Sequence, residues 1–190
     1  MNLDKKNLRA KLKKKRDSLL YNDVITKSRL IAERLYKLDD YKQSYLILFY
    51  VSYDNEVYTH EMIKETLRRG KRIVVPYIYE EDKKMILSEL LRWEDLTPGP
   101  YNILQPLKDK IRVINIDNID IIIVPGLGFD IRGNRIGHGL GYYDALLKKA
   151  RNKNKYGLAF ESQLLDHIPS EPHDIKVDYI ITEERIIKCC

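Results

Sequence analysis

The sequence has few cysteines and no long apolar segment, and each absence excludes a class of protein. Its two cysteines, Cys189 and Cys190, are adjacent at the end of the chain, so a disulfide framework and a cysteine-bound metal are excluded. No segment approaches the roughly 18 uninterrupted apolar residues of a membrane span. No apolar core of a signal peptide follows the first charged residues. We therefore expect reduced thiols and a cytoplasmic protein without a membrane partner.

The sequence also lacks the composition of a disordered chain. Of its 190 residues, 44% are hydrophobic and 33% are charged, which is enough apolar material to bury a core without covalent cross-links. We find no linker and no internal repeat, and the only biased segment is a short basic run. Residues 1–190 are therefore predicted to form a single domain, as a monomer or a homodimer.

Positive charge is concentrated near the N-terminus of this chain, whose net charge is +6. From Lys5 to Arg16, eight of twelve residues are Lys or Arg. Leu8, Leu12 and Leu19 fall roughly on one face, which predicts an amphipathic helix docked on the core with solvated lysines. A nucleic-acid surface and a contribution to a site for an anionic substrate are alternatives. Because no nucleic-acid recognition motif is visible, no nucleic-acid partner is expected.

Segments of helix length alternate with apolar segments of strand length. Helices are predicted at residues 4–19, 23–38, 59–69 and 142–152, and strands at residues 45–51, 72–77, 85–90, 119–124, 155–160 and 177–182. Asn22 is expected to cap the second helix and Gly70 to end the third, and the prolines of residues 98–106 predict a loop.

Strands that are apolar at every position are covered on both faces. The pattern therefore predicts an α/β fold of three layers, α/β/α, with a mostly parallel central sheet. Ligands of such sheets bind beyond the carboxyl ends of the strands. Candidate sites consequently lie just after residues 51, 77, 124, 160 and 181.

Glycine is scarce except in one turn between a predicted strand and a predicted helix. Six of the nine glycines lie within sixteen residues, at Gly126, Gly128, Gly133, Gly137, Gly139 and Gly141. Glycine permits positive φ and a close approach of the backbone to a ligand. Successive N–H groups at a helix N-terminus can hold an anion such as a phosphate. A glycine-rich turn of purely structural importance is the alternative.

Charged residues in this turn suit a polyphosphate. Arg132 and Arg135 could bind phosphate oxygens in bidentate fashion. Asp144 stands at the start of the next helix, and a carboxylate beside a polyphosphate suits Mg²⁺. The turn is neither a Walker loop nor a dinucleotide fingerprint, because it lacks the Gly-Lys-Ser/Thr ending and the Gly-x-Gly-x-x-Gly spacing.

The same segment resembles a known family. Pro-Gly-Leu-Gly-Phe-Asp at residues 125–130, followed by Gly-Asn-Arg-Ile-Gly-His-Gly-Leu-Gly-Tyr-Tyr-Asp at 133–144, is similar to the signature of 5-formyltetrahydrofolate cyclo-ligases. Weaker elements occur in the family's order at residues 5–9, 54–57, 101–106, 159–163 and 173–178. The resemblance implies a fold like that of NagB, RpiA and the CoA transferases. It also implies an enzyme that converts 5-formyltetrahydrofolate and MgATP to 5,10-methenyltetrahydrofolate, ADP and phosphate through an N5-iminium phosphate.

The resemblance assigns the ATP site. Arg135, Tyr143 and Asp144 would be the catalytic residues. The ATP phosphates would be bound by two residues of the basic helix and by nine of residues 133–144, which we call the glycine segment. These residues are Lys5, Arg9, Arg135, Ile136, Gly137, His138, Gly139, Leu140, Gly141, Tyr142 and Tyr143.

The resemblance also assigns the folate and magnesium sites. Val51, Glu56 and Tyr143 would bind the reduced folate, with Glu56 accepting hydrogen bonds from the pterin ring. Asp144 and Asp178 would hold Mg²⁺. Judged by position alone, Glu56 could be an ordinary loop carboxylate, and Asp178 could simply pair with a nearby lysine.

The chain departs from the family at two positions of the glycine segment. Many members carry an arginine where this chain has His138, and a lysine or arginine where it has Leu140. Arg9, Arg132 or Lys176 could supply the missing positive charge. Two other outcomes stay open, namely a different carbonyl substrate on the same fold, and a folate-binding protein without turnover.

Overall fold

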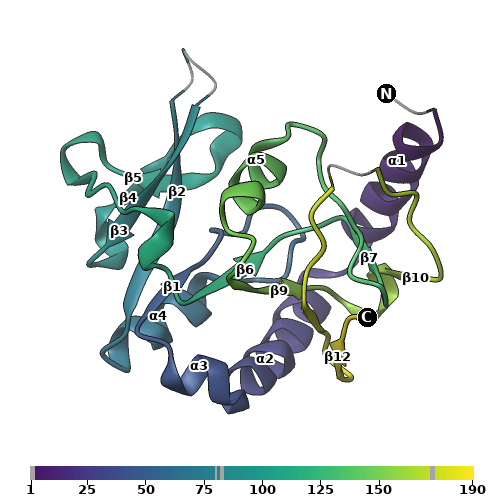
Figure 1. Ribbon diagram of the computed structural model, residues 1–190, viewed down its shortest axis with the longest axis horizontal. Coiled ribbons are helices and arrows are strands. Elements are labelled where there is room, and N and C mark those ends of the chain that lie inside the picture. The colour runs from purple at the N-terminus through teal and green to yellow at the C-terminus, as the bar shows by residue number, and fades with distance from the viewer. Residues whose placement is uncertain (1–2, 80, 82–83, 172–173) are drawn as a thin grey trace.

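A computed structural model describes residues 3–79, 81, 84–171 and 174–190 of the chain (Figure 1). Its α-helices are α1 (Leu3–Asp17), α2 (Tyr21–Lys37), α3 (Asp39–Gln43), α4 (His60–Arg68) and α5 (Tyr142–Lys149). Its strands are β1 (Leu46–Leu48), β2 (Arg72–Tyr79), β3 (Lys84–Leu90), β4 (Leu96–Pro98), β5 (Leu104–Pro106), β6 (Ile121–Val124), β7 (Gly128–Asp130), β8 (Arg135–Ile136), β9 (Asn154–Leu158), β10 (Leu164–Leu165), β11 (Tyr179–Ile181) and β12 (Ile186–Lys188).

The central sheet has seven strands in the order β12-β11-β9-β6-β1-β2-β3. Its five inner strands, from β11 to β2, are parallel, and the two edge strands β12 and β3 are antiparallel to their neighbours. The predicted mostly parallel sheet is therefore confirmed. The chain runs from β1 to β2 on one side and then continues with β6, β9 and β11 on the other, so the strand order reverses between β1 and β6.

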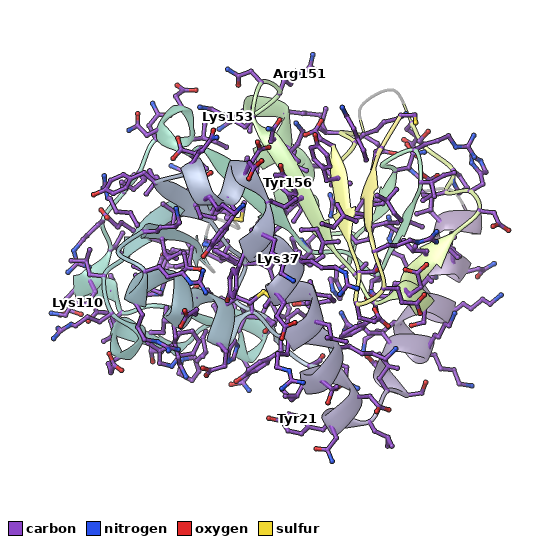
Figure 2. All side chains as sticks on the ribbon, turned by 90° about the horizontal axis from the view of Figure 1, so that it is seen from below. Tyr21, Lys37, Lys110, Arg151, Lys153 and Tyr156 are labelled. Carbon is purple, nitrogen blue, oxygen red and sulfur yellow. The ribbon has the colours of Figure 1, made fainter. Side chains whose placement is uncertain are left out.

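The sheet is covered on both faces. Apolar side chains of α2, α3 and α4 pack with sheet residues in one core cluster, and those of α5 pack with the opposite face in another. Figure 2 views the first of these faces, across which α2 runs from the exposed Tyr21 to Lys37. The strands are buried on nearly every residue because helices cover both of their faces, as the apolar pattern predicted.

A small second sheet, in the order β10-β7-β8, joins two strands of the glycine-rich region, β7 and β8, to β10 from the connection between β9 and β11. Leu12 of α1 packs against Leu127, Ile136 and Ile168 there, in a third core cluster. The basic helix is thus docked by its apolar face, as expected, and it lies beside the glycine segment (Figure 1).

Four details of the predicted elements are wrong. Leu20, not Asn22, is the N-cap residue of α2, and its side chain makes no capping hydrogen bond. Residues 98–106 are not only loop, because β4 and β5 pair there. The turn at residues 125–141 contains β7 and β8, and the short α3 and β12 were not predicted. The expected end of α4 is confirmed, since Gly70 follows the helix with a φ of 76°.

Within the described part of the chain, no helix combines the length and the apolar character that crossing a membrane requires.

Candidate active site

A cavity of about 370 Å³ opens beyond the carboxyl ends of β1 and β6. Tyr50 and Val51, which follow β1, and Pro125, which follows β6, contribute to its lining. Parallel α/β sheets bind ligands where the strand order reverses, because the connections leave a crevice there. Of the five predicted positions, those after residues 51, 77 and 124 lie at this cavity, since Tyr53, Ile78 and Pro125 line it.

The cavity has one apolar wall and one wall of backbone. The apolar wall comes from β2, β3 and the β4–β5 hairpin and contains Pro76, Ile78, Met85, Ile103 and Leu104. The opposite wall is the glycine segment, which contributes Arg135 and every residue from 137 to 144. Sequence reasoning missed the hairpin wall. Gln105, which belongs to the family-like element at residues 101–106, anchors this wall by accepting a hydrogen bond from the N–H of Ile78 at 3.0 Å.

The backbone N–H groups of the glycine wall are available to a ligand. Residues 137–141 lie outside helices and strands, and within the described residues their N–H groups donate no hydrogen bond. Gly139 and Gly141 have φ values of 92° and 75°, which residues with a side chain rarely adopt. Since α5 begins at Tyr142, the partial positive charge of its N-terminus adds to these groups. This geometry suits an anion.

A buried carboxylate fixes the start of the glycine segment. Asp130 is fully buried and accepts hydrogen bonds from the N–H groups of Arg132, Asn134 and Ile168, and from the side chain of Asn134. The turn is closed further by the bond from the N–H of Gly133 to the carbonyl of Asp130. The segment is thus held at its base, while its far end faces the cavity.

Arg135 lies in the wall of the cavity with its charge directed towards Asp144. Its side chain is 5% exposed, and it donates to the carbonyl of Pro125 at 3.3 Å and to the carboxylate of Asp144. The Nε of Arg135 has no hydrogen-bond partner among the described residues. A Cβ on Gly137 would lie 2.8 Å from the Arg135 guanidinium, so glycine is needed for this close approach.

Tyr143 points its hydroxyl into buried space. The hydroxyl oxygen is inaccessible to solvent and has no partner among the described residues. Burial, followed by the nearby charge of Glu56, raises the pKa of Tyr143 well above its usual range. The group therefore stays protonated and can donate a hydrogen bond to a bound molecule.

Glu56 lines the cavity and is 6% exposed. Its carboxylate accepts from the N–H of Tyr53 at 3.3 Å and lies 3.5 Å from Nη1 of Arg16 and 3.4 Å from Nε2 of His138. The hydroxyl of Tyr53 in turn lies 3.2 Å from His138. Burial raises the pKa of Tyr53 to about 12, so this hydroxyl is also protonated. Arg16 and Tyr53 were not singled out in the sequence.

The two cations predicted on the basic helix have different positions. Arg9 donates from Nε to the carbonyl of Gly137 at 3.1 Å, and its guanidinium lies over Gly139. Lys5 instead pairs with Asp174 at 2.8 Å and with Glu171 at 3.3 Å and is not part of the cavity lining. Arg9 thus lies beside the glycine segment, whereas binding of the ATP phosphates by Lys5 stays a prediction.

Two further candidate residues, Ile136 and Arg132, do not line the cavity. Ile136 is buried in the core cluster beside α1 and does not line the cavity. Arg132 binds the ring of His167 at 3.0 Å, away from the cavity. Of the three cations that could replace the family's missing charge, Arg9 contacts the part of the glycine segment that lines the cavity, at Gly137 and Gly139, whereas Lys176 lies beside Gly133. His173 of the C-terminal element lies outside the described residues.

Asp144 and Asp178 are not brought together. Asp178 precedes β11, at the amino ends of the parallel strands, whereas the cavity lies at their carboxyl ends. Its carboxylate pairs with the buried ammonium of Lys155 at 2.9 Å and accepts from the Lys155 N–H at 2.8 Å. The lysine pairing considered as the alternative is therefore present, and the magnesium role of Asp178 stays a prediction. Among the described residues no group of three or more His, Cys, Asp or Glu side chains could hold a metal.

The fold and the cavity together define an α/β protein with a candidate ligand site beyond the carboxyl ends of its parallel strands. The model of the 5-formyltetrahydrofolate cyclo-ligase family matches residues 2–183, and the chain belongs to this family. It is therefore an enzyme of folate one-carbon metabolism, and the family and its neighbours indicate cyclo-ligase activity.

Individual relatives agree with this family. A 5-formyltetrahydrofolate cyclo-ligase of Mus musculus is 32% identical, over 97% of this chain and 96% of the mouse protein. One of Haemophilus influenzae is 28% identical, over 92% and 96%. The NMR structure of Aquifex aeolicus 5,10-methenyltetrahydrofolate synthetase superimposes with a TM-score of 0.86, at 29% identity, over 97% of this chain and 92% of that one. The Mycoplasma pneumoniae synthetase, at 23% identity and a TM-score of 0.75, supports the fold alone and covers 95% and 99%.

Proposed function

We propose that this chain closes 5-formyltetrahydrofolate to 5,10-methenyltetrahydrofolate with MgATP as co-substrate, through an N5-iminium phosphate. The observation that carries the nucleotide part of the proposal is the run of residues 137–141, which line the cavity and whose N–H groups donate no hydrogen bond to the described residues. Such a row beside a helix N-terminus favours a phosphate.

The terminal phosphates of ATP would lie along this row. Arg9 and Arg135 stand on either side of it and would neutralise part of the phosphate charge. Arg9 would thereby supply charge that other family members place at the positions of His138 and Leu140. The exposed Leu140 adds an apolar contact at the edge of the cavity instead.

The folate would occupy the end of the cavity near Glu56. A carboxylate accepts two hydrogen bonds, which matches the adjacent N–H groups on the edge of a pterin ring. Val51 and the apolar wall would contact the faces of the ring, together with Tyr143 of the glycine wall. The formyl group would then point towards the phosphates.

The chemistry requires two steps. The formyl oxygen attacks the γ-phosphorus, an O–P bond forms, and the bond to ADP breaks. N10 then attacks the iminium carbon, loses its proton and closes the ring, and phosphate departs with the electron pair of the C–O bond. A formyl oxygen leaves poorly, whereas phosphate leaves readily. The protein contributes position and stabilisation of the phosphoryl charge.

Magnesium would enter with the nucleotide. Mg²⁺ commonly takes one or two carboxylates together with phosphate oxygens and water, so a larger acidic cluster is not required. Asp144 is the carboxylate on the glycine wall, at the first turn of α5, and its side chain is 42% exposed. This position fits a metal bound to phosphates. Asp178 does not belong to this proposal.

The direct test mixes the pure protein with 5-formyltetrahydrofolate, ATP and Mg²⁺ and follows the absorbance of the conjugated methenyl product. We expect product and ADP to form in equal amounts, and none without ATP. ADP release that does not depend on 5-formyltetrahydrofolate would favour a different carbonyl substrate. Binding of the folate without ADP release would identify a protein that has lost turnover.

A further inference from the structure

Arg16 differs from the other cations of the basic helix. Its neighbours Lys13, Lys14 and Lys15 are exposed, whereas Arg16 is 1% exposed and is among the largest fully buried side chains of the described residues. A buried guanidinium is costly unless it is paired, so its position requires an explanation beyond the solubility of the helix.

The partners of Arg16 lie next to the cavity, although Arg16 itself does not line it. Nη1 lies 3.5 Å from Oε1 of Glu56, and Nη2 lies 3.5 Å from Oδ1 of Asp17. The guanidinium carbon is 5.9 Å from the centre of the Tyr53 ring. The Nε has no partner among the described residues. The Arg16 guanidinium therefore contacts the Glu56 carboxylate, which lines the cavity, without lining the cavity itself.

The backbone around this contact is tied together. The side-chain amide of Asn55 donates to the carbonyls of Arg16, Asp17 and Leu19, at 3.4, 3.2 and 2.9 Å, which satisfies the C-terminal end of α1. Because Asn55 precedes Glu56 in the chain, these bonds fix the distance between the helix end and the carboxylate. The Arg16–Glu56 contact consequently belongs to a braced unit.

We propose that Arg16 is a positioning residue for folate recognition, which orients the Glu56 carboxylate into the cavity and balances its buried charge. The identity of the ligand rests on the proposed function, whereas the positioning of Glu56 rests on the contacts. Other polar groups near this carboxylate are His138 and Tyr53, which contact it, and the hydroxyls of Tyr50 and Tyr143. Arg16 is the one among these that carries a permanent positive charge.

A purely structural role for Arg16 makes a different prediction. If the side chain only attached α1 to the core, its loss would weaken nucleotide and folate binding together, because Arg9 of the same helix contacts the glycine segment. If Arg16 acts through Glu56, its loss weakens folate binding selectively, and the effect vanishes once the Glu56 carboxylate is gone.

The experiment measures equilibrium binding by calorimetry for Arg16→Met, Arg16→Lys and the matched exposed control Lys15→Met. The two ligands are 5-formyltetrahydrofolate and the Mg²⁺ complex of a non-hydrolysable ATP analogue. For Arg16→Met we expect the folate Kd to rise roughly 100-fold, with a small change for the nucleotide. Arg16→Lys keeps the charge but loses the planar fork, and we expect a rise of roughly tenfold. Lys15→Met binds both ligands as the wild type does.

The same measurements in a Glu56→Gln background complete the cycle. There, replacing Arg16 is expected to change the folate Kd less than about threefold. An equal loss of folate and nucleotide affinity, or an undiminished effect in the Glu56→Gln background, would overturn the proposal. If Arg16→Met does not fold, the Arg16→Lys variant tests the proposal. Wild-type folate affinity in that variant would contradict the idea that the guanidinium orients the Glu56 carboxylate. Because binding is measured without turnover, failure of the wild type to form product refutes the proposed reaction but not the positioning role.

Discussion

The guanidinium of Arg135 donates a hydrogen bond to the carboxylate of Asp144, nine residues further along the chain, on the wall of the cavity. The arginine is almost fully buried and the aspartate is partly exposed. In the proposed reaction the two groups change partners, as Arg135 turns to a phosphate oxygen and Asp144 to the magnesium. The ion pair therefore holds both groups in place before the nucleotide binds.

Replacing Asp144 by Ala should reduce kcat roughly 100-fold or more, because the variant loses its contact to the metal that neutralises the transferring phosphoryl group. The fold should persist, because the side chain is partly exposed on a helix surface. Steady-state rates at increasing Mg²⁺, with thermal unfolding in parallel, check both points. Asp109→Ala, at an exposed site away from the cavity, is the control. Wild-type rates for Asp144→Ala would contradict the magnesium role.

Replacing Glu56 by Ala should raise the KM for 5-formyltetrahydrofolate by roughly 100-fold, with little change in the KM for ATP. The reason is that the carboxylate would contact the pterin and not the nucleotide. The variant should also lose about 3 kcal/mol of stability, because Arg16 stays buried but loses the carboxylate of Glu56 as its partner. Equal effects on both KM values would count against the pterin contact.

Substitutions at two glycines distinguish an effect on phosphate binding from an effect of backbone strain. Gly141 and Gly70 have φ values of 75° and 76°, and a Cβ on either would meet nothing within 4 Å. Gly141→Ala and Gly70→Ala should therefore each cost about 1 kcal/mol of stability. Only Gly141→Ala should raise the KM for ATP, because a shift of its backbone moves the N–H groups beside α5. Similar ATP kinetics in the two variants would argue against a phosphate at this turn.

Asp178→Asn should lower stability without changing the Mg²⁺ dependence of the reaction. The carboxylate pairs with a buried lysine at the amino ends of β9 and β11, where Lys155 also donates to two backbone carbonyls. Loss of the charge should cost about 1–2 kcal/mol, since the aspartate is partly exposed. Urea unfolding together with a magnesium titration tests this. A large rise in the Mg²⁺ requirement with unchanged stability would restore Asp178 as a metal ligand.

His60 should make stability depend on pH. Its ring lies between those of Tyr58 and Trp93 and close to the carbonyl of Ser52, and burial lowers the pKa of His60 below 6.5. The unfolded chain therefore binds a proton that the folded chain does not, and stability should fall as the pH decreases below about 6.5. His60→Gln should flatten this part of the profile in urea unfolding between about pH 5 and pH 7. An unchanged slope would assign it to other groups.

The fold could be predicted because its signal is local. Strands such as β6 are apolar on every residue since helices cover both faces, and that pattern is visible in the sequence. Gly70 likewise ends α4 by its own backbone preference. The β4–β5 hairpin was missed because its strands are three residues long and contain prolines, which locally favour a loop.

The candidate site was predictable only in part. The glycine segment reveals itself by composition, and most of it does line the cavity. The position of each cation in the basic helix cannot be predicted from composition, because it depends on contacts between distant segments. Lys5 pairs with residues more than 160 positions away, and Arg16 is buried against Glu56. Eight similar charges in twelve residues give no local sign of which one is buried.

The most direct test of the account is an NMR titration of ¹⁵N-labelled protein with Mg²⁺ and a non-hydrolysable ATP analogue. The N–H groups of Gly137, Gly139 and Gly141 should show the largest shifts, and they should do so before any folate is added. Nucleotide binding that leaves these three signals unchanged and shifts those of another surface would contradict the phosphate site. It would also contradict the proposed phosphorylation of the formyl oxygen at this site.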